Sequence, residues 1–528
     1  MVTVLDYGAG NVRSVVNAVQ RLGYTVRFVT RPEDILSAER LIFPGVGAFG
    51  EMMRVLRRRG FVEPLRRYLE ADRPFLGICL GLQALFQGSE EAPGEDGIGF
   101  LEGTVRRFRV DLAVPHIGWN GIKPQKPSAL FGGLEGDEKV YFVHSFHVVP
   151  EDPSVVLTTT DYGLEFVSAV QKGRVAAVQF HPEKSGPTGL AILKNFLEGM
   201  DAPPVRPPRT PSKTELAKRI IACLDVRTND QGDLVVTKGD RYDVRERGTV
   251  RNLGKPVELA RRYYEEGADE ITFLNITGFR DFPLKDLPML EVLRRTSENV
   301  FVPLTIGGGI RDYVDQDGTA YTALEVASEY FRSGADKISI GSDAVRIVEE
   351  VLRTGKKSGH SAVETISRVY GSQAVVISID PRRVYVPSPQ AVPHRVLETA
   401  YPGPNGERWC WYQCTVKGGR EGRPVDAVTL ALVCQELGAG EILLNCIDRD
   451  GTNAGFDLEL INAVKDAVSI PVIASSGAGC AEHFLEVFTR TRAESALAAG
   501  IFHRREVPIS AVKAFLAGKV PIRPILGA

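Results

Sequence analysis

The C-terminal part of the chain contains one series of four strand-like runs twice. The paired segments are residues 220–225 and 375–380, 267–271 and 438–442, 302–308 and 470–477 and, more loosely, 334–341 and 493–500. Helix-length segments separate the eight runs, which is the organisation of alternating βα units. The pattern therefore predicts a (β/α)8 barrel made of two half-barrels, with a doubly wound open sheet as the alternative.

A proline-rich segment separates this repeat from the rest of the chain. Residues 201–212 read DAPPVRPPRTPS and contain five prolines. Such a run forms neither a helix nor a central strand, and it favours an extended polyproline conformation. We therefore expect an N-terminal domain at residues 1–202, a linker at 203–217 and a barrel domain at 218–528. The alternative is an internal loop of a single domain.

The N-terminal part has the pattern of an α/β domain around a central sheet, because strand-like runs alternate there with helical patterns. The expected strands are residues 2–5, 25–29, 40–43 and 74–78, and the expected helices are 12–22 and 51–69. Two later runs, 140–149 and 175–180, look more antiparallel. The predicted fold class is α/β, with an α/β domain followed by the barrel.

One of these strands ends in a candidate nucleophile. Residues 75–83 read FLGICLGLQ, in which Gly-x-Cys-x-Gly is the thiol form of the strand–turn–helix nucleophile elbow around Cys79. Residues 179–184 read QFHPEK, so His181 can act as the base and Glu183 can orient it. Either motif alone is weak, since the first occurs by chance and a lone histidine is commonly structural. Together, each at the end of an apolar run, they predict a Cys-His-Glu triad.

Two aspartates occupy matching places in the repeat. Asp225 ends the first strand of the predicted barrel and Asp380 ends the fifth. The pseudo-twofold symmetry puts them on opposite sides of the barrel mouth, where active sites of this fold lie. Two carboxylates that face each other across a substrate suit a general acid and a general base. A single aspartate at such a place could equally be a helix cap or a surface residue.

Glycine-rich turns also recur in both halves of the repeat. Exposed amides in such turns bind anions together with helix N-termini, so two related sites predict a substrate with a phosphate at each end. The residues expected to bind phosphate or substrate are Gly307, Gly308, Gly341 and Ser342 in the first half, Ser476, Gly477, Ala499 and Gly500 in the second, and Lys238, Asp450 and Gly451 in other loops. The alternatives are plain turns and, for Asp450, a salt-bridged loop.

Composition argues against several kinds of partner and cofactor. The net charge of −2 argues against a nucleic-acid or membrane-surface role. No apolar run approaches the roughly 20 residues of a membrane span. Met1 leads directly into a strand-like run, which leaves no room for a signal or transit peptide. The seven cysteines are scattered without zinc-site spacing, so we expect no metal, no cofactor and a reducing compartment, the cytoplasm.

Six further motifs resemble one known family. They are PGVG at 44–47, PHIGWN at 115–120, YFVHS at 141–145, ACLD at 222–225, IDRDG at 447–451 and ASSGAG at 474–479. The first three are similar to class I glutamine amidotransferases, and the last three are similar to a barrel cyclase. Both parts together resemble the imidazole glycerol phosphate synthase family over nearly the whole chain, in the fused form found in eukaryotes.

The resemblance implies a reaction of histidine biosynthesis. Cys79 would attack the carboxamide of glutamine and release ammonia, which would pass through the barrel to the phosphoribulosyl-formimino aminoimidazole carboxamide ribotide. Asp225 and Asp380 would then catalyse the formation of imidazole glycerol phosphate and aminoimidazole carboxamide ribotide. The implied partners are glutamine and the bis-phosphorylated ribotide, and both activities in one chain imply a monomer.

The same resemblance implies three groups of supporting residues. They are Gly45, Val46, Gly47, Gln83, His144 and Ser145 for the oxyanion and glutamine-binding site, Arg219, Glu270, Lys337 and Glu441 for an ammonia gate at the amino-terminal end of the barrel, and Lys184 and Asp336 for a pair across the domain interface. A salt-bridge cluster that only stabilises the barrel is the alternative for the gate.

Three rival functions have to be weighed against this family. Pyridoxal phosphate synthase also joins a glutaminase to a barrel, but it requires a Schiff-base lysine at a strand end, where this barrel has aspartates. The others are a γ-glutamyl peptidase with an unrelated barrel and a scaffold of degenerate domains. Two stretches are additions to the repeat: residues 381–417, either a lid over the cyclase mouth or an ordinary insertion, and residues 312–322, expected to be a surface loop.

Overall fold

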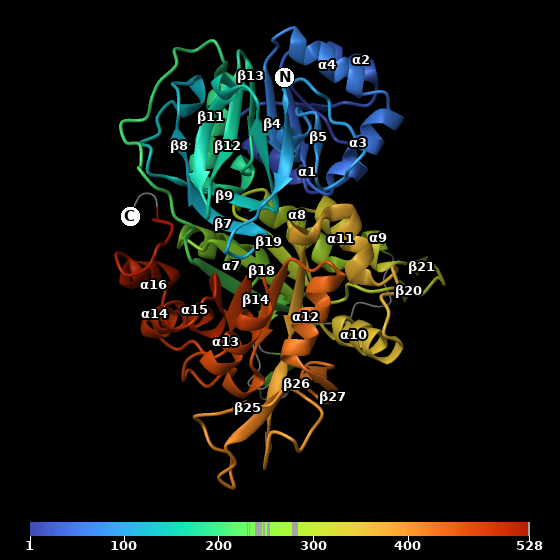
Figure 1. Ribbon diagram of the computed structural model, residues 1–528, viewed down its shortest axis with the longest axis vertical. Coiled ribbons are helices and arrows are strands. Elements are labelled where there is room, and N and C mark those ends of the chain that lie inside the picture. Colours follow the sequence, from blue (N-terminus) through green and yellow to red (C-terminus); the bar gives the residue numbers. More distant parts are fainter. Residues whose placement is uncertain are drawn as a thin grey trace.

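An α/β domain lies on one end of a closed barrel, and a small antiparallel sheet projects from the opposite end (Figure 1). The structure is a computed structural model that describes residues 1–229, 231, 233–237, 245–246, 249–250, 254–276 and 284–525. The two large units therefore meet end to end, with the N-terminal domain facing the base of the barrel (Figure 1).

The N-terminal domain is built on an 11-stranded sheet. Its main path runs β2 (Val26–Phe28), β1 (Val2–Val4), β3 (Leu41–Gly45), β4 (Phe75–Cys79), β13 (Val175–Val178), β12 (Glu165–Lys172), β10 (Phe146–Pro150), β6 (Gly103–Arg107) and β5 (Gly88–Ser89), and β11 (Val156–Asp161) and β8 (Lys123–Pro124) lie off this path. The strands from β2 to β13 are parallel, so the carboxyl ends of β3, β4 and β13 meet at one edge. Sites in such sheets lie at this edge.

Helices flank this sheet and a separate pair of strands. The helices are α1 (Val12–Arg21), α2 (Pro32–Leu36), α3 (Phe49–Arg58), α4 (Val62–Glu70), α5 (Leu80–Gln83) and α6 (Gly186–Glu198). The strand pair consists of β7 (His116–Gly121) and β9 (Lys139–His144), which pair with each other in antiparallel orientation. The helical pattern at 51–69 is therefore two helices rather than one, because Gly60 at φ 68° interrupts it.

The two runs expected to be antiparallel are only partly so. The run at 140–149 is divided at Ser145 between β9 and β10, which belong to different sheets. The run at 175–180 forms β13, which pairs antiparallel with β12 but parallel with β4. β13 is thus the strand at which the parallel part of the sheet changes to the antiparallel part.

Eight parallel strands close into a barrel in the C-terminal domain. They are β14 (Arg219–Thr228), β18 (Glu270–Asn275), β19 (Leu304–Gly307), β22 (Lys337–Ile340), β23 (Val375–Ile379), β28 (Glu441–Asn445), β29 (Val472–Ser475) and β30 (Ser495–Ala498). β14 pairs with both β18 and β30, which closes the ring and excludes the open sheet. The predicted (β/α)8 barrel is therefore confirmed, strand by strand.

Helices surround this barrel on the outside (Figure 1). They are α7 (Pro256–Glu265), α8 (Pro288–Ser297), α9 (Ala323–Arg332), α10 (Ser342–Thr354), α11 (Ala362–Tyr370), α12 (Ala427–Leu437), α13 (Leu458–Ala467), α14 (Ala481–Arg490), α15 (Gly500–His503) and α16 (Ile509–Leu516). Their apolar faces and the outward-facing strand residues share one large buried cluster. A smaller buried cluster inside the barrel consists of Ile221, Cys223, Val376, Leu443, Ile473 and Leu497.

The proline-rich segment runs along the surface of the N-terminal domain. Residues 199–218, all of which the structure describes, contain no helix and only isolated bridges. Val205 pairs with Ser128, and the Arg209 amide donates a hydrogen bond to the Glu135 carbonyl at 2.8 Å. The segment is therefore extended, as its prolines require, and it is held to the domain by backbone hydrogen bonds.

The two additional stretches of the barrel domain both form β structure. Between β23 and α12, the chain makes an antiparallel sheet of β24 (Pro381–Val386), β25 (Leu397–Glu398), β26 (Trp409–Val416) and β27 (Glu421–Asp426). This insertion sheet extends away from the N-terminal domain (Figure 1). The stretch at 312–322 forms a hairpin of β20 (Tyr313–Val314) and β21 (Ala320–Tyr321) rather than an irregular loop.

Candidate active sites

Close backbone contacts shape the nucleophile elbow at Cys79. Cys79 ends β4 at φ 55° and leads into the single helical turn of α5. A Cβ atom on Gly77 would lie 2.6 Å from the Gly81 carbonyl oxygen, and one on Gly81 would lie 2.1 Å from the Phe43 carbonyl oxygen. Both positions therefore require glycine. The left-handed backbone of a non-glycine residue is strained, as is typical of functional sites.

His181 and Glu183 lie beside this thiol. His181 Nδ1 donates a hydrogen bond to Glu183 Oε1 at 2.8 Å, and the imidazole also hydrogen-bonds to Cys79. Gln179 Nε2 lies 3.4 Å from Cys79 Sγ. Because the carboxylate fixes the proton on Nδ1, the imidazole presents Nε2 to the sulfur. The three residues of the predicted triad are thus assembled and buried.

The charges around His181 favour its protonated form. Burial opposes protonation of His181, but the charges of Glu183 and Cys79 raise its pKa well above the usual value. An imidazolium beside a thiolate is the reactive form of a cysteine nucleophile. His181 is therefore placed to hold a proton beside the sulfur of Cys79.

The predicted oxyanion segment, Gly45 to Gly47, continues from β3 along the same pocket. The Tyr7 hydroxyl donates a hydrogen bond to the Val46 carbonyl. A Cβ atom on Gly47, at φ 119°, would lie 2.8 Å from the carbonyl oxygen of Val369 in barrel helix α11. The amide of the next residue, Ala48, donates to the same Val369 carbonyl at 3.1 Å. The oxyanion segment therefore contacts the barrel directly.

Gln83, His144 and Ser145 line this pocket as well. Gln83 Nε2 donates to Gln179 Oε1 at 3.2 Å, and His144 Nδ1 donates to the Phe146 carbonyl at 2.7 Å. Burial lowers the pKa of His144 to about 3, so its imidazole is neutral. The Ser145 hydroxyl is buried without a hydrogen-bond partner among the described residues, which leaves it available to a ligand.

The barrel forms one wall of this pocket. The pocket has a volume of about 680 Å³, and its barrel residues are Phe331, Ala335, Asp336, Gln373 and Ala374. Lys184 Nζ lies 2.9 Å from Asp336 Oδ2, and Asn11 Nδ2 donates to Asp336 Oδ1 at 2.8 Å. The structure thus brings Lys184 and Asp336 together across the interface, beside the triad.

The four residues expected to form a gate make a closed ring of alternating charges at the barrel base. Each is the first residue of its strand: Arg219 of β14, Glu270 of β18, Lys337 of β22 and Glu441 of β28. Glu270 lies 2.8 Å from Arg219 Nη1 and 2.6 Å from Lys337 Nζ. Glu441 lies 2.8 Å from Lys337 Nζ and also pairs with Arg219. Burial opposes ionisation of Glu441, but Arg219 and Lys337 lower its pKa and so favour the charged form of this carboxylate.

The two aspartates of the barrel lie on opposite strands of the ring, β14 and β23. Asp380 follows β23, and Asn445 Nδ2 donates to its Oδ1 at 2.9 Å. Burial raises the pKa of Asp380 to about 6; Asn445 opposes the rise and the charge of Asp450 adds to it. The expectation that Asp225 ends its strand is wrong, because β14 continues to Thr228 and pairs with β15 (Leu234–Thr237).

The loops after β28, β29 and β30 enclose a second pocket, of about 380 Å³. Its lining includes the six residues predicted there, Asp450, Gly451, Ser476, Gly477, Ala499 and Gly500. Ser476 has φ 77°, and a Cβ atom on Gly477 would lie 2.1 Å from the Gly455 carbonyl oxygen. A strained, tightly packed turn of this kind exposes backbone amides to an anion.

The corresponding residues of the first half lie at the ends of β19 and β22, which are neighbours. Gly307 ends β19, and a Cβ atom on Gly308, at φ 91°, would lie 2.2 Å from the Asn275 carbonyl oxygen. Gly341 caps α10, whose first residue is Ser342. These four residues therefore share one side of the mouth. Lys238, which was expected to bind one phosphate, lies outside the described residues.

Two family models match the chain, one over each large unit. A glutamine amidotransferase class-I model matches residues 3–200, and a histidine biosynthesis protein model matches residues 219–508. A protein of Arabidopsis thaliana named imidazole glycerol phosphate synthase hisHF, chloroplastic, is 60% identical over 523 residues, which are 98% of this chain and 88% of the relative. The chain belongs to the imidazole glycerol phosphate synthase family.

Two further members of the family match over almost their whole length. The synthase hisHF of Schizosaccharomyces pombe is 55% identical over an alignment of 533 positions that covers 98% of each chain. That of Emericella nidulans is 54% identical over an alignment of 537 positions that covers 98% of this chain and 97% of the relative. The predicted family, fold class and enzyme class are therefore confirmed in the fused form, and the pyridoxal phosphate synthase alternative is not supported. Within the described residues, no helix combines the length and the apolar character of a membrane span.

The glutaminase pocket contains residues that were not predicted from the sequence, among them Glu91 and Tyr141. Glu91, from the segment after β5, lines the pocket and accepts a hydrogen bond from the Phe49 amide at 3.0 Å. Burial raises the pKa of Glu91 to about 6. Tyr141 of β9 also lines the pocket, and its buried hydroxyl has no partner among the described residues. Tyr141 belongs to the YFVHS motif, whereas no local pattern distinguishes Glu91 from its neighbour Glu90.

Proposed function

We propose that the chain hydrolyses glutamine at Cys79 and delivers the ammonia through the barrel to the phosphoribulosyl-formimino aminoimidazole carboxamide ribotide. The products are glutamate, imidazole glycerol phosphate and aminoimidazole carboxamide ribotide. The observation that carries this proposal is the position of the charged ring defined above. It lies between a pocket that contains the triad and a barrel interior that leads to Asp225 and Asp380.

The first half-reaction uses the thiolate of Cys79 as the nucleophile on the glutamine carboxamide. Donors near the Gly45–Gly47 segment stabilise the oxyanion of the tetrahedral intermediate. His181 donates its proton to the leaving nitrogen, so ammonia departs and a glutamyl thioester remains. His181 then activates a water molecule that hydrolyses the thioester, while Glu183 keeps the imidazole oriented.

Ammonia must cross the domain interface as the neutral molecule, because only that form has a lone pair for attack. An apolar path favours the neutral form, since burying an unpaired ammonium ion is costly. The cluster of Ile221, Val376, Leu443, Ile473 and neighbouring residues supplies such a lining. All four ion pairs of the ring are formed in this structure, so passage requires the ring to open.

The second half-reaction takes place at the mouth of the barrel. Two anion sites, one at β28–β30 and one at β19–β22, bind the two phosphates and hold the ribotide across the mouth. Asp225 and Asp380 then face the reacting carbons from opposite strands. Together they supply the general acid and the general base for attack by ammonia, ring closure and cleavage.

Glu91 is proposed to bind the α-ammonium group of glutamine. It is a carboxylate that lines the pocket and forms no ion pair with a cation in the described part of the chain. A charged hydrogen bond contributes roughly 1.5–3 kcal/mol, so Glu91→Gln is expected to raise KM for glutamine on the order of 10- to 100-fold. The measurement is the steady-state glutaminase rate as a function of glutamine concentration. Glu90→Gln is the matched control, because Glu90 forms an exposed ion pair with Arg109. An unchanged KM would remove Glu91 from the binding site.

The function itself is tested by following both half-reactions of the purified chain together. With glutamine and the ribotide present, glutamate and imidazole glycerol phosphate are expected in equal amounts. Glutamine hydrolysis is expected to be faster with the ribotide than without it, because the oxyanion segment contacts the barrel at Val369. A hydrolysis rate indifferent to the ribotide would favour a hydrolase with an unrelated barrel.

A monomer in a reducing compartment completes this proposal. Both large units in one chain support a monomer, and mass determination in solution tests it. All seven cysteines are free in the structure, which fits the cytoplasm and equally the chloroplast, the compartment in the name of the Arabidopsis relative. Fractionation of cells that express the tagged chain distinguishes the two.

A further inference from the structure

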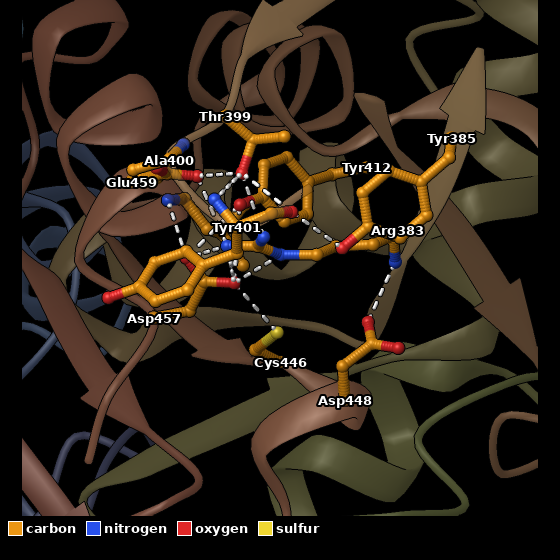
Figure 2. Close-up of polar contacts among 11 residues, drawn as sticks. Arg383, Tyr385, Thr399, Ala400, Tyr401, Tyr412, Cys446, Asp448, Asp457 and Glu459 are labelled. Carbon is orange, nitrogen blue, oxygen red and sulfur yellow. Dashed lines mark hydrogen bonds and ion pairs between the residues drawn. The ribbon is translucent and has the colours of Figure 1, made fainter. Parts of the chain in front are cut away.

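One buried arginine of the insertion sheet binds the loop after β28. We define the β28 loop as residues 446–457, between β28 and α13. Arg383 of β24 places Nε and Nη2 each 3.1 Å from the two carboxylate oxygens of Asp457, and its Nη2 also lies 3.2 Å from Glu459 (Figure 2). The Arg383 side chain is only 6% exposed. A bidentate pair so far from solvent fixes the relative position of the two segments.

The same cluster holds the β28 loop at both of its ends. At the start, the Arg383 backbone amide donates to Asp448 Oδ2 at 2.7 Å (Figure 2). At the end, Asp457 accepts hydrogen bonds from the Tyr412 hydroxyl at 3.1 Å and from the Cys446 thiol at 3.2 Å. Cys446 and Asp457 therefore close the base of the loop, and Arg383 ties both ends to the insertion sheet.

Between these ends, the β28 loop lines the pocket at the ends of β28, β29 and β30. Asp450, Gly451 and Asn453 belong to both the loop and the pocket lining. The Gly455 amide donates to the Gly477 carbonyl at 2.8 Å, so the loop also packs on the turn after β29. Any displacement of the loop would change the shape of this pocket and the position of Asp450.

We propose that Arg383 is a positioning residue of the cyclase, which sets the β28 loop so that the backbone of Gly451 receives one phosphate of the ribotide. This role rests on the proposed cyclase function. It makes the insertion sheet a fixed brace of the barrel mouth rather than a lid, because its contact is a buried, multiply bonded cluster. Arg383 itself acts only through Asp448, Asp457 and Glu459.

The test measures ammonia-dependent turnover of the ribotide by the full chain, which bypasses the glutaminase. Arg383→Ala is expected to raise KM for the ribotide on the order of 10- to 100-fold, since a displacement of about 1 Å has effects of this size. Arg383→Lys keeps the charge but not the bidentate geometry, so its KM for the ribotide is expected to lie between those of the wild type and Arg383→Ala. Basal glutaminase activity should not change. Arg408→Ala is the matched control, because Arg408 forms an exposed pair with Glu398 of the same insertion sheet.

A purely structural role for Arg383 predicts a different result. A lower melting temperature with KM and kcat unchanged would overturn the proposal, and so would an equal rise of KM in Arg408→Ala. If Arg383→Ala does not fold, Asp448→Ala removes only the acceptor of the Arg383 amide, and Asp448→Asn keeps an acceptor oxygen there. The first is expected to raise KM and the second to restore it. A wild-type chain without ammonia-dependent turnover would instead overturn the proposed function, and with it the positioning role.

Discussion

Replacing Cys79 by alanine is expected to abolish turnover that depends on glutamine while turnover with added ammonia persists. In the proposed mechanism His181 activates this thiol, and alanine leaves no group at that place to attack the carboxamide. Removal of a triad nucleophile costs on the order of 10⁴-fold or more in kcat. The barrel strands and the anion pocket at β28–β30 do not involve Cys79, so the cyclase should retain its own rate. Glutamate release and ribotide consumption, measured separately, check the two parts.

A second cysteine provides the control for this substitution. Cys480, at the start of α14, is partly exposed and lies outside both pockets. Cys480→Ala is expected to leave both activities unchanged. Loss of ammonia-dependent turnover in Cys79→Ala would contradict two separate sites in one chain, and retained glutamine-dependent turnover would mean that another group is the nucleophile.

Asp380→Asn is expected to have the converse effect. Asparagine keeps the shape of the side chain but can neither accept nor donate the catalytic proton as a carboxyl group does, and general acid–base catalysis contributes roughly 10²–10⁴-fold. Ribotide turnover should fall by about that factor with either nitrogen source, while basal glutamine hydrolysis survives. The control is Asp466→Asn, because Asp466 of α13 forms an exposed ion pair with Arg492. A variant that retains cyclase activity would exclude Asp380 as the acid or the base.

The pH dependence of the cyclase gives an independent check on Asp380. Its pKa is raised to about 6, chiefly by burial, so the carboxyl group is mostly ionised at pH 7 and becomes protonated as the pH falls through 6. An ionised carboxylate can act as the base. Ammonia-dependent kcat is therefore expected to fall below about pH 6 at a fixed saturating concentration of neutral ammonia. If kcat instead falls above pH 6, Asp380 works in its protonated form, as the acid.

Local pattern predicted the barrel and the elbow well, for identifiable physical reasons. Neighbouring parallel strands need a crossover connection, which is usually a helix. The repeated series of strand-like runs at 220–341 and 375–500, separated by helix-length segments, is therefore compatible with few folds other than a barrel. The glycines around Cys79 follow from one steric demand, the 2.1 Å approach of the Phe43 carbonyl to a Cβ atom on Gly81. The end of the first barrel strand was misplaced at Asp225 because β14 continues beyond it and pairs with β15. The sequence of β15 has no regular alternation of apolar and polar residues that would have predicted this pairing.

Other features of the sites depend on contacts between distant segments, which local pattern does not encode. Glu91 reaches the pocket only because the segment after β5 folds back onto the amide of Phe49. Arg383, in the insertion at 381–417, is buried against Asp457, which lies 74 residues further along the chain. Such contacts arise when whole helices and strands pack together. The residues in contact are therefore separated by no characteristic number of residues along the sequence.

The barrel and the α/β domain could be predicted from the sequence, and so could the candidate triad and the two candidate aspartates, because each prediction depends on periodicity or on a steric demand within a short segment. The contacts between the two units became visible only in the folded chain. The Ala48 amide donates a hydrogen bond to the Val369 carbonyl, a contact that was not predicted, and Lys184 pairs with Asp336, a contact that only the family resemblance implied. These contacts depend on how two independently built surfaces dock, and docking is set by shape and charge over many residues rather than by any local motif.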